Sequence, residues 1–482
     1  MKVALLSSEV VPFAKTGGLA DVSGALPGAI KRAGVKEVIV ILPAYRHAKK
    51  SGQQLTHFGE LKFRFAGKDV TAGILRSTIE ENIHVYLIDK DEYYDREGLY
   101  VSPTGDYPDN AWRFAFFCTA SIELLKKIDF KADIIHCNDW QSGLTPLLLK
   151  TTYAEDKYFS KTATCITVHN LAYQGNFKRE ELPPLGIPEE CFSDNGMKFY
   201  DVQSFLKAGL IYSTVINTVS KKYSEEIQTE EFGCGMQNIL KWRTDRLFGI
   251  LNGVDYNEWS PETDKFIPYK FSISDLTGKQ KCKEELQKES GLEKAPDKPL
   301  LGVVTRLAVQ KGVDVLANIA SKILDGGAQI VVLGTGEKEY ETRLQEIAAK
   351  YPDSASVRIG FDNRLAHLIE AGSDMFLMPS RYEPCGLNQM YSLKYGTIPV
   401  VRATGGLDDT IVDFETDKKK GNGFKFAELN EANLLQKIKA ACTLYKSSAW
   451  QKITKNSMAC DFSWDKSAKE YIKLYKKAKT LI

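Results

Sequence analysis

The sequence lacks any long uninterrupted apolar run, any clear excess of one charge and any closely spaced pair of cysteines. No stretch of about 18 uncharged apolar residues occurs, so we expect no membrane-spanning helix. Lysine and arginine total 64 against 62 aspartate and glutamate residues, a net charge of +2. A net charge this small creates no overall electrostatic field that would attract nucleic acid or an anionic membrane. An anionic ligand would therefore need a local binding site.

The nine cysteines are an odd number and include no C-x-x-C pair. Cysteines scattered in this way are typical of reduced thiols rather than of disulfides or structural zinc. The first residues, Met1–Glu9, reach a carboxylate too early for a signal peptide. We therefore expect a cytoplasmic protein that is not anchored to a membrane.

Two series of short apolar runs divide the 482 residues, a length that predicts more than one domain. Because these runs are β-branched, apolar on both faces and separated by helical stretches, they predict two doubly wound parallel sheets covered by helices on both sides. The first series comprises 3–7, 38–42, 83–88, 133–137, 165–168 and 215–219, and the second comprises 300–305, 329–333, 357–359, 375–378 and 398–401.

A polar stretch, 255–299, separates the two series and carries four prolines around a lysine-rich helical segment, 276–289. We interpret it as an insertion and hinge. At the end of the sequence, 464–482 has apolar residues at three- and four-residue spacing with lysines between them. This pattern predicts an amphipathic helix whose apolar face is buried against another part of the protein.

One internal repeat stands out: Thr-Gly-Gly-Leu-x-Asp occurs at 16–21 and again at 404–409. Each copy follows a predicted strand and precedes a predicted helix. Glycines let backbone N–H groups approach a ligand closely, and a helix N-terminus favours negative charge. The pair therefore predicts two anion-binding loops; two ordinary Gly-Gly turns are the alternative.

Charged residues follow the strands of the second series. Arg306 and Lys311 leave one strand, and two cations at the carboxyl end of a parallel sheet suit a diphosphate. Glu383 leaves another, between Tyr382 and Pro384. A carboxylate there is placed to bind sugar hydroxyls and to stabilise charge at a reacting carbon. The alternatives are that Arg306 and Lys311 are ordinary solvated side chains, and that Glu383 only interacts with the dipole of the following helix.

In the first series, Asp139 and His169 follow two successive strands, so both are predicted to meet a substrate at one sheet edge. His136 belongs to a strand interior, and the other histidines show no ligand spacing. Asp89-Lys90-Asp91 matches a D-x-D metal motif, but an acidic surface turn explains it better.

Taken together, six motifs in order resemble the family of bacterial glycogen synthases and plant starch synthases, over essentially the whole chain. These motifs are Lys15 to Val22, Asn138-Asp139-Trp140, His169 to Gly175, Asn252 to Asp255, Arg306 to Gly312 and Glu383 to Leu387. The resemblance implies the GT-B fold: two Rossmann-like doubly wound domains facing a cleft, with a C-terminal helix that returns to the N-terminal domain. The implied domains are 1–254, 255–460 and 461–482.

That family transfers glucose from ADP-glucose to the non-reducing end of an α-1,4-glucan, with retention of configuration. The resemblance thus implies ADP-glucose and glycogen as partners, and neither a metal nor another cofactor. Arg306, Lys311, Lys15 and the amides of Gly17 and Gly18 would bind the diphosphate, and Glu383 would face the glucose. The remaining implied contacts are Asp139, Trp140, His169 and Asn252 around the sugar, Cys385, Gly386 and Leu387 at its hydroxyls, and Thr404, Gly405 and Gly406 at the phosphates, with Asp21 as a further substrate-binding residue.

The sequence departs from the family pattern at three positions. Phe361 stands where many relatives have a tyrosine that stacks on adenine, Gln141 where histidine is common, and Asn388 where threonine is frequent. The first departure keeps the ring, and the other two concern the acceptor and sugar contacts.

The rival interpretations are another GT-B enzyme with a different donor or acceptor, a pyridoxal-phosphate phosphorylase, and an inactive glucan-binding protein. The Lys15 loop argues against a different donor or acceptor. An inactive protein would be expected to have lost Arg306, Lys311 or Glu383, and all three are present.

Overall fold

The computed structural model describes all 482 residues and divides into two compact units. Unit 1 comprises 1–253 together with 464–482, and unit 2 comprises 254–463. The chain thus changes unit one residue before the boundary expected at 254 and returns three residues after the one expected at 460. No helix is long and apolar enough to cross a membrane.

Unit 1 is built on a nine-stranded sheet in the order β14-β13-β9-β8-β1-β2-β5-β4-β3. Seven of these strands, from β14 to β5, pair in parallel; the apolar runs predicted six of them, and the three-residue β14 was not predicted. Their bounds are β1 Lys2–Leu6, β2 Glu37–Pro43, β5 Ile83–Asp89, β8 Ile134–Asn138, β9 Ala163–Val168, β13 Val215–Thr218 and β14 Leu247–Gly249.

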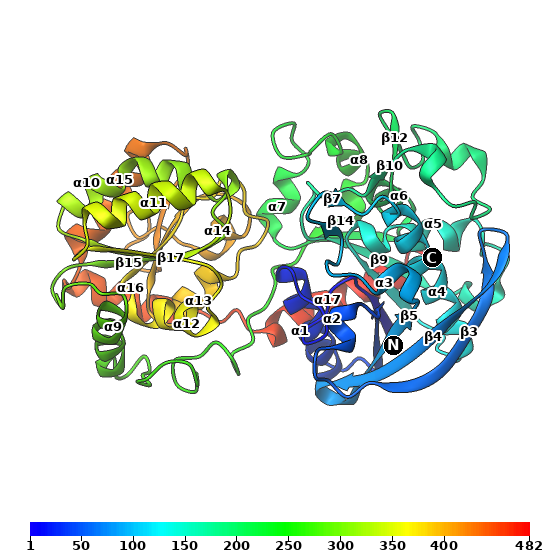
Figure 1. Ribbon diagram of the computed structural model, residues 1–482, viewed down its shortest axis with the longest axis horizontal. Coiled ribbons are helices and arrows are strands. Elements are labelled where there is room, and N and C mark those ends of the chain that lie inside the picture. The colour runs from blue at the N-terminus through cyan, green and yellow to red at the C-terminus, as the bar shows by residue number, and fades with distance from the viewer. The chain divides into compact units, whose positions relative to one another are not determined.

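The antiparallel edge of this sheet was not predicted. It is a long hairpin of β3 Thr56–Phe65 and β4 Lys68–Ile79, which runs along the edge in Figure 1. β3 alternates polar and apolar residues from Glu60 to Phe65, the pattern of a strand with one face in water. A strand of this kind contains no continuous apolar run, so the apolar runs of the sequence do not reveal it.

Helices cover the sheet of unit 1. They are α1 Gly18–Arg32, α4 Asn110–Lys127, α5 Leu144–Lys150, α6 Phe205–Tyr212, α7 Lys221–Glu226, α8 Gln237–Trp242 and α17 Trp464–Lys479, with single turns α2 Arg46–Lys49 and α3 Asp91–Tyr94. Short strands complete the unit: β6 Val101–Ser102, β7 Gly105–Asp106, β10 Asn176–Phe177, β11 Lys198–Phe199 and β12 Val202–Ser204.

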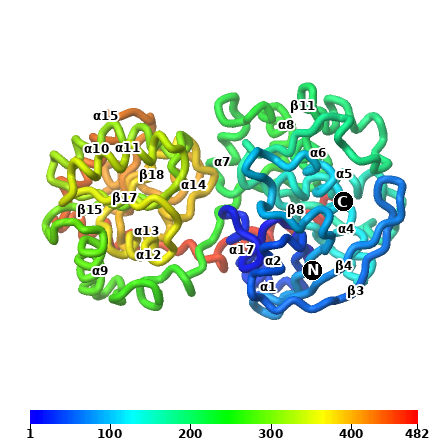
Figure 2. Tube along the Cα trace, in the orientation of Figure 1, coloured from blue at the N-terminus to red at the C-terminus, as the bar shows by residue number.

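The C-terminal helix α17 returns to unit 1, as the resemblance implied, and lies beside α1 (Figure 2). Tyr471 and Tyr475 of its apolar stripe are fully buried. The Tyr475 hydroxyl lies 2.7 Å from Nδ1 of His136, and the amide of Asn217 donates to the Tyr471 hydroxyl. His136 is therefore a structural residue of the strand interior, as expected.

Unit 2 has a six-stranded, all-parallel sheet in the order β17-β16-β15-β18-β19-β20. The strands are β15 Leu300–Val304, β16 Gln329–Gly334, β17 Ala355–Ile359, β18 Met375–Met378, β19 Ile398–Arg402 and β20 Phe424–Phe426. The first five were predicted; β20, three residues long, was too short to stand out.

Helices lie on both faces of this sheet, which explains its continuous apolar runs. Alternate residues of β15 enter different cores: Leu301 and Val303 face one and Leu300 the other. Figure 1 shows α10 Val313–Asp325, α11 Lys338–Lys350 and α15 Glu431–Leu444 on one side, and α12 Asn363–Gly372 and α13 Asn388–Lys394 on the other. The remaining helices are α9 Thr277–Glu289, α14 Gly405–Thr410 and α16 Ser448–Met458.

Candidate active site

Asp139 and His169 lie together at the carboxyl end of the unit 1 sheet. β8 and β9 are neighbours, and the two residues follow their last positions. The backbone N–H of His169 donates to Oδ1 of Asp139 over 2.7 Å, and Nε2 of His169 lies 2.9 Å from Oδ1 of Asn138. The structure thus brings together two residues that strand order alone had placed at one edge.

The backbone of Asp139 is strained. Its φ of +53° and ψ of −171° fall in a region that residues other than glycine rarely adopt. Such a conformation costs about 1–3 kcal/mol and persists mainly at functional sites. The strained backbone therefore favours a functional role for Asp139.

Burial controls the charges of this pair. Desolvation raises the pKa of Asp139 to about 7, against the lowering effect of the His169 and Asn170 amides, and the Glu9 carboxylate raises it further. Burial lowers the pKa of His169 to about 3. At neutral pH the imidazole is therefore uncharged, and Asp139 sits near its titration midpoint.

Glu9 is a residue of this site that sequence reasoning missed. It comes shortly after β1, is only 4% exposed, and accepts hydrogen bonds from the backbone N–H groups of Thr16 (2.5 Å) and Gly17 (3.1 Å). The hydroxyls of Thr16 and Tyr100 also donate to it, over 2.6 and 2.8 Å. The available signal in the sequence was a carboxylate three residues after an apolar strand.

These contacts change the picture of the first glycine loop. The Gly17 N–H, expected to meet a phosphate, already donates to the Glu9 carboxylate. Lys15 is half exposed, with Nζ 2.7 Å from Oδ1 of Asp21. Burial raises the pKa of Asp21, while Lys15 acts in the opposite direction. The Gly17 amide is therefore occupied, whereas Lys15 remains accessible to an anion.

Trp140 is a wall of the site. Its ring is 8% exposed and packs edge-on against Phe114, with centroids 4.8 Å apart, and tilted against Phe177 at 5.7 Å. Gly175 has a φ of +59°, and a Cβ there would lie 2.4 Å from the Trp140 ring. The indole is therefore locked in place next to Asp139.

Asn252 lies after β14, in the last residues of unit 1 before the chain enters unit 2. It is 6% exposed, and its side-chain oxygen Oδ1 accepts no hydrogen bond. A buried acceptor without a donor costs free energy and often awaits a ligand or water.

In unit 2, Lys311 and Glu383 form a close ion pair. Lys311 ends a short turn after β15 and Glu383 follows β18, two neighbouring strands. Nζ of Lys311 is 2.5 Å from Oε2 of Glu383, which also accepts from the Ser380 hydroxyl over 3.0 Å. The side chains are 18% and 8% exposed, so little solvent screens the pair.

The second glycine loop packs on the backbone around Glu383. The N–H of Gly406 donates to the carbonyl oxygens of Glu383 (3.1 Å) and Pro384 (3.2 Å). Gly405 has a φ of +45°, and a Cβ on it would lie 2.0 Å from the Glu383 carbonyl oxygen. Thr404 directly precedes these glycines. The glycines of this loop thus serve a close backbone approach that supports Glu383.

The other expected residues of unit 2 lie on loops after its strands. Arg306 is exposed, and its guanidinium donates to Oε1 of Gln310 over 3.0 Å. Phe361, between β17 and α12, is 86% exposed. Cys385, Gly386 and Leu387 precede α13, and Gly386 has a φ of +71°.

The two departures from the family pattern outside the adenine position differ in their surroundings. Asn388 donates from Nδ2 to the Val304 carbonyl over 2.9 Å, which ties α13 to β15. Gln141 is 5% exposed, with its Oε1 unpaired. No group of three or more histidine, cysteine, aspartate or glutamate side chains could hold a metal ion.

Two Rossmann-like units with charged side chains at the carboxyl ends of their strands are the architecture of the GT-B class of glycosyltransferases. Residues 2–242 match the family described as "Starch synthase catalytic domain", and residues 284–457 match "Glycosyl transferases group 1". Curated glycogen synthases of Syntrophotalea carbinolica and Koribacter versatilis are 46% and 47% identical over 99% of this chain and 99% and 98% of theirs.

A solved structure, the catalytic domain of starch synthase IV from Arabidopsis thaliana bound to ADP and acarbose, superposes with a TM-score of 0.90. It is 32% identical, and 99% of each chain is covered. The chain belongs to the glycogen synthase and starch synthase family of glycosyltransferases.

Proposed function

We propose that this chain transfers glucose from ADP-glucose to the non-reducing end of an α-1,4-glucan, with retention at the anomeric carbon. The observation that carries the proposal is the buried Lys311–Glu383 ion pair at the ends of two adjacent strands. It combines a cation for a departing diphosphate with a carboxylate for the sugar. The ADP and acarbose named for the Arabidopsis relative support a nucleotide donor and a glucan-like acceptor.

The charges fit this chemistry. Breaking the bond between glucose and the diphosphate develops positive charge on the sugar and negative charge on the departing ADP. Lys311, Arg306 and Lys15 would stabilise the ADP, while Glu383 would stabilise the sugar. Since three cations share this role, the proposal needs neither a metal ion nor another cofactor.

The proposed stereochemistry follows from the carboxylates. A retaining hydrolase uses a pair of carboxyl groups, an acid and a nucleophile. In unit 2 the site offers one buried carboxylate after β18, Glu383, and it is paired with a lysine. We therefore favour attack by the acceptor hydroxyl on the face from which ADP departs, with a donor phosphate oxygen taking the proton.

Asp139 and His169 would serve the sugar rather than the phosphates. The neutral ring of His169 presents one nitrogen as donor and one as acceptor, and Asp139 accepts hydrogen bonds in its ionised form. Trp140 fixes their position, and Asn252 offers an unused acceptor. In unit 2, Cys385, Gly386 and Leu387 would meet the glucose hydroxyls, Phe361 would stack on the adenine, and Thr404, Gly405 and Gly406 would support the phosphate side.

Incorporation of labelled glucose into glycogen, measured in parallel from ADP-glucose and UDP-glucose, tests the proposal. The expected result is transfer from ADP-glucose into α-1,4 linkages. Glu383→Gln should lower turnover on the order of 10²–10³-fold with little change in donor affinity, because the lost charge acts in the transition state.

The matched control is Asp413→Asn. Asp413 pairs with Lys437 over 3.1 Å, with side-chain exposures of 7% and 17% that resemble those of the Lys311–Glu383 pair. This variant should keep near-parent turnover. Full activity in Glu383→Gln, or β linkages in the product, would refute the mechanism.

A further inference from the structure

Arg381 is a charged residue of unit 2 that the proposed mechanism leaves without a role. It follows β18, two residues before Glu383, but its guanidinium lies against the turn that carries Lys311. Nη1 and Nη2 lie 2.7 Å from the two carboxylate oxygens of Asp314, and Nη1 also donates to the Val309 carbonyl over 2.7 Å. Lys311 lies between Val309 and Asp314 in the chain. Arg381 therefore holds the Lys311 turn on both sides, while its own backbone leads directly to Glu383.

The backbone of Arg381 is fixed to two neighbouring segments. Its N–H donates to the Gln310 carbonyl over 2.8 Å, and its carbonyl accepts from the guanidinium of Arg402 at the end of β19. The side chain of Gln310 donates to the Tyr382 carbonyl over 3.3 Å and accepts from Arg306 over 3.0 Å. Backbone and side-chain contacts thus join the loop after β15 to the loop after β18, and they reach the exposed cation Arg306.

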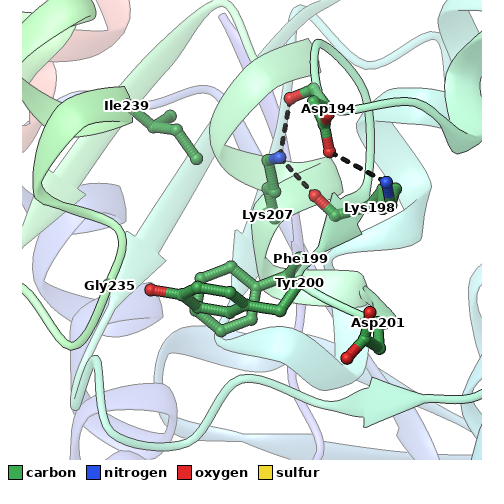
Figure 3. Close-up of a pocket in the computed structure, with 8 residues that line it drawn as sticks. All are labelled: Asp194, Lys198, Phe199, Tyr200, Asp201, Lys207, Gly235 and Ile239. Carbon is green, nitrogen blue, oxygen red and sulfur yellow. Dashed lines mark hydrogen bonds and ion pairs between the residues drawn. The ribbon is translucent and has the colours of Figure 1, made fainter.

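The guanidinium of Arg381 is occupied by protein acceptors, which argues against direct contact with a diphosphate. Its hydrogen bonds lower the pKa of Asp314, and the Asp314 carboxylate raises the pKa of Arg381, so both groups are charged at neutral pH. Two parallel hydrogen bonds between a planar guanidinium and a carboxylate fix orientation as well as distance. In unit 1, Lys207 likewise donates to the backbone carbonyls of Asp194 and Lys198 and fastens the wall of the cavity in Figure 3.

We propose that Arg381 is a positioning residue that sets the distance between the Lys311 ammonium and the Glu383 carboxylate through its contacts with Asp314. This inference deepens the proposed function and rests on it. Lys311 and Glu383 would stabilise opposite charges in the transition state, and charged groups that are already in place do so without reorganisation. A displacement of about 1 Å that begins away from the reacting atoms can lower a rate on the order of 10²-fold. Loosening the Arg381 contacts should therefore lower kcat although both charges remain.

Arg381→Lys tests the geometry, because lysine keeps the positive charge but cannot form the two parallel hydrogen bonds. We expect kcat with ADP-glucose and glycogen to fall roughly 10- to 100-fold, with KM for ADP-glucose within about threefold of the parent. The melting temperature should stay close to that of the parent, because ion pairs this exposed contribute little to stability. The Arg381 and Asp314 side chains are 38% and 28% exposed.

The matched control is Arg32→Lys. Arg32 ends α1, its side chain is 39% exposed, and its guanidinium donates twice to the Asp465 carboxylate, over 3.1 and 3.2 Å. It forms the same kind of arginine–carboxylate contact away from the Lys311–Glu383 pair. This variant should therefore keep the kcat and KM of the parent.

Asp314→Asn separates positioning from a direct role of the Arg381 charge, because it weakens the contact and leaves Arg381 in place. Positioning predicts a fall in kcat similar to that of Arg381→Lys. An Arg381 that binds the diphosphate would instead be released, and kcat would stay unchanged while KM for ADP-glucose stayed equal or fell. The double variant Arg381→Lys/Asp314→Asn should lose no more than the worse single variant, since both changes break one contact.

Steady-state kinetics and thermal melts of the parent and the four variants decide between these outcomes. Parent-like kcat in Arg381→Lys or Asp314→Asn, or additive losses in the double variant, would overturn the positioning role. Loss of the folded state in both single variants would overturn it as well, because Arg381 would then serve the fold alone. Absence of glucose transfer by the parent would instead refute the proposed function.

Discussion

The two Thr-Gly-Gly-Leu-x-Asp loops share a sequence but use their glycines for different physical reasons. In unit 1 the Gly17 amide donates to the buried Glu9 carboxylate, and a Cβ on Gly17 would meet nothing within 4 Å. In unit 2 the Gly406 amide donates to backbone carbonyls, and a Cβ on Gly405 would strike the Glu383 carbonyl oxygen. An identical motif thus holds a loop around a carboxylate in one unit and supports a carboxylate-bearing segment in the other.

The largest difference between the loops should appear on substituting their glycines. Gly405→Ala combines a positive φ with a Cβ 2.0 Å from backbone, so it must displace Glu383. We expect turnover to fall on the order of 10²-fold, by analogy with the loss of one electrostatic group, and stability to fall by about 1–3 kcal/mol. Gly17→Ala, with an extended backbone and open space, should change turnover less than about tenfold. Initial rates and thermal unfolding of both variants measure this difference. Equal losses of turnover and stability in Gly405→Ala and Gly17→Ala would contradict it.

The Lys311–Glu383 pair of unit 2 should matter more for turnover than a similarly buried pair elsewhere in that unit. Lys311→Ala removes a charge-assisted contact worth about 1.5–3 kcal/mol, so kcat/KM for ADP-glucose should fall roughly 10- to 100-fold. Lys437→Ala breaks the Asp413 pair and should affect stability only. Steady-state kinetics and urea unfolding of the two variants separate the roles. Near-parent rates of Lys311→Ala at saturating donor would remove Lys311 from the site.

One aromatic ring in each unit extends the comparison: Phe361 of unit 2 is exposed, whereas Trp140 of unit 1 is buried. Removing Phe361 should therefore cost no packing. Phe361→Ala should weaken ADP binding about 5- to 150-fold through lost base stacking and leave the melting temperature unchanged. Trp140 packs against Phe114 and Phe177, so Trp140→Ala should instead unfold the protein at a lower temperature. Calorimetric titration of ADP and thermal melts test both; parent-like ADP affinity of Phe361→Ala would exclude stacking.

The stability of unit 1 should also depend on pH, because the buried Asp139 has a raised pKa. The pKa of Asp139, about 7 in the folded chain, exceeds the unfolded value of about 4. Between these values the folded state holds a proton that the unfolded state has released, so the free energy of unfolding falls as the pH rises. Asp139→Asn should therefore stabilise the protein by about 1–2 kcal/mol at pH 8 and by less at pH 5, while turnover falls. Urea unfolding at both pH values is the measurement, and an equal effect at both would contradict the assignment.

The smallest expected effect concerns Glu9, the carboxylate that accepts hydrogen bonds from the 16–21 loop. Glu9→Gln keeps the size of the side chain but removes the charge that raises the pKa of Asp139. The pH dependence of unfolding should shift to lower pH by a few tenths of a unit, on the order expected for one screened neighbouring charge. Hydrogen exchange of the Thr16 and Gly17 amides should also quicken. Unchanged exchange would show that Glu9 does not hold the loop.

Particular elements show how far the sequence could be followed. The parallel strands were predictable because residues such as 38–42 and 329–333 are apolar on both faces, a pattern that few other structures share. The β3–β4 hairpin was missed because its alternation resembles polar surface, and β20 because three residues carry too little signal. In the C-terminal helix the three- and four-residue spacing does not decide every contact, since Ile472 is half-buried while Leu474 is buried.

By itself the sequence determined the two Rossmann-like units, the returning helix and the family, because periodicity and motif spacing are local properties. It also placed Asp139, His169, Lys311 and Glu383 at strand ends. Only the tertiary structure decided which polar groups become partners: Glu9 with the Gly17 amide, Gly406 with the Glu383 carbonyl, and Lys311 with the Glu383 carboxylate. These pairings join loop residues that lie from 8 to 72 positions apart in the chain, and the cost of leaving a buried donor or charge unpaired selects among them.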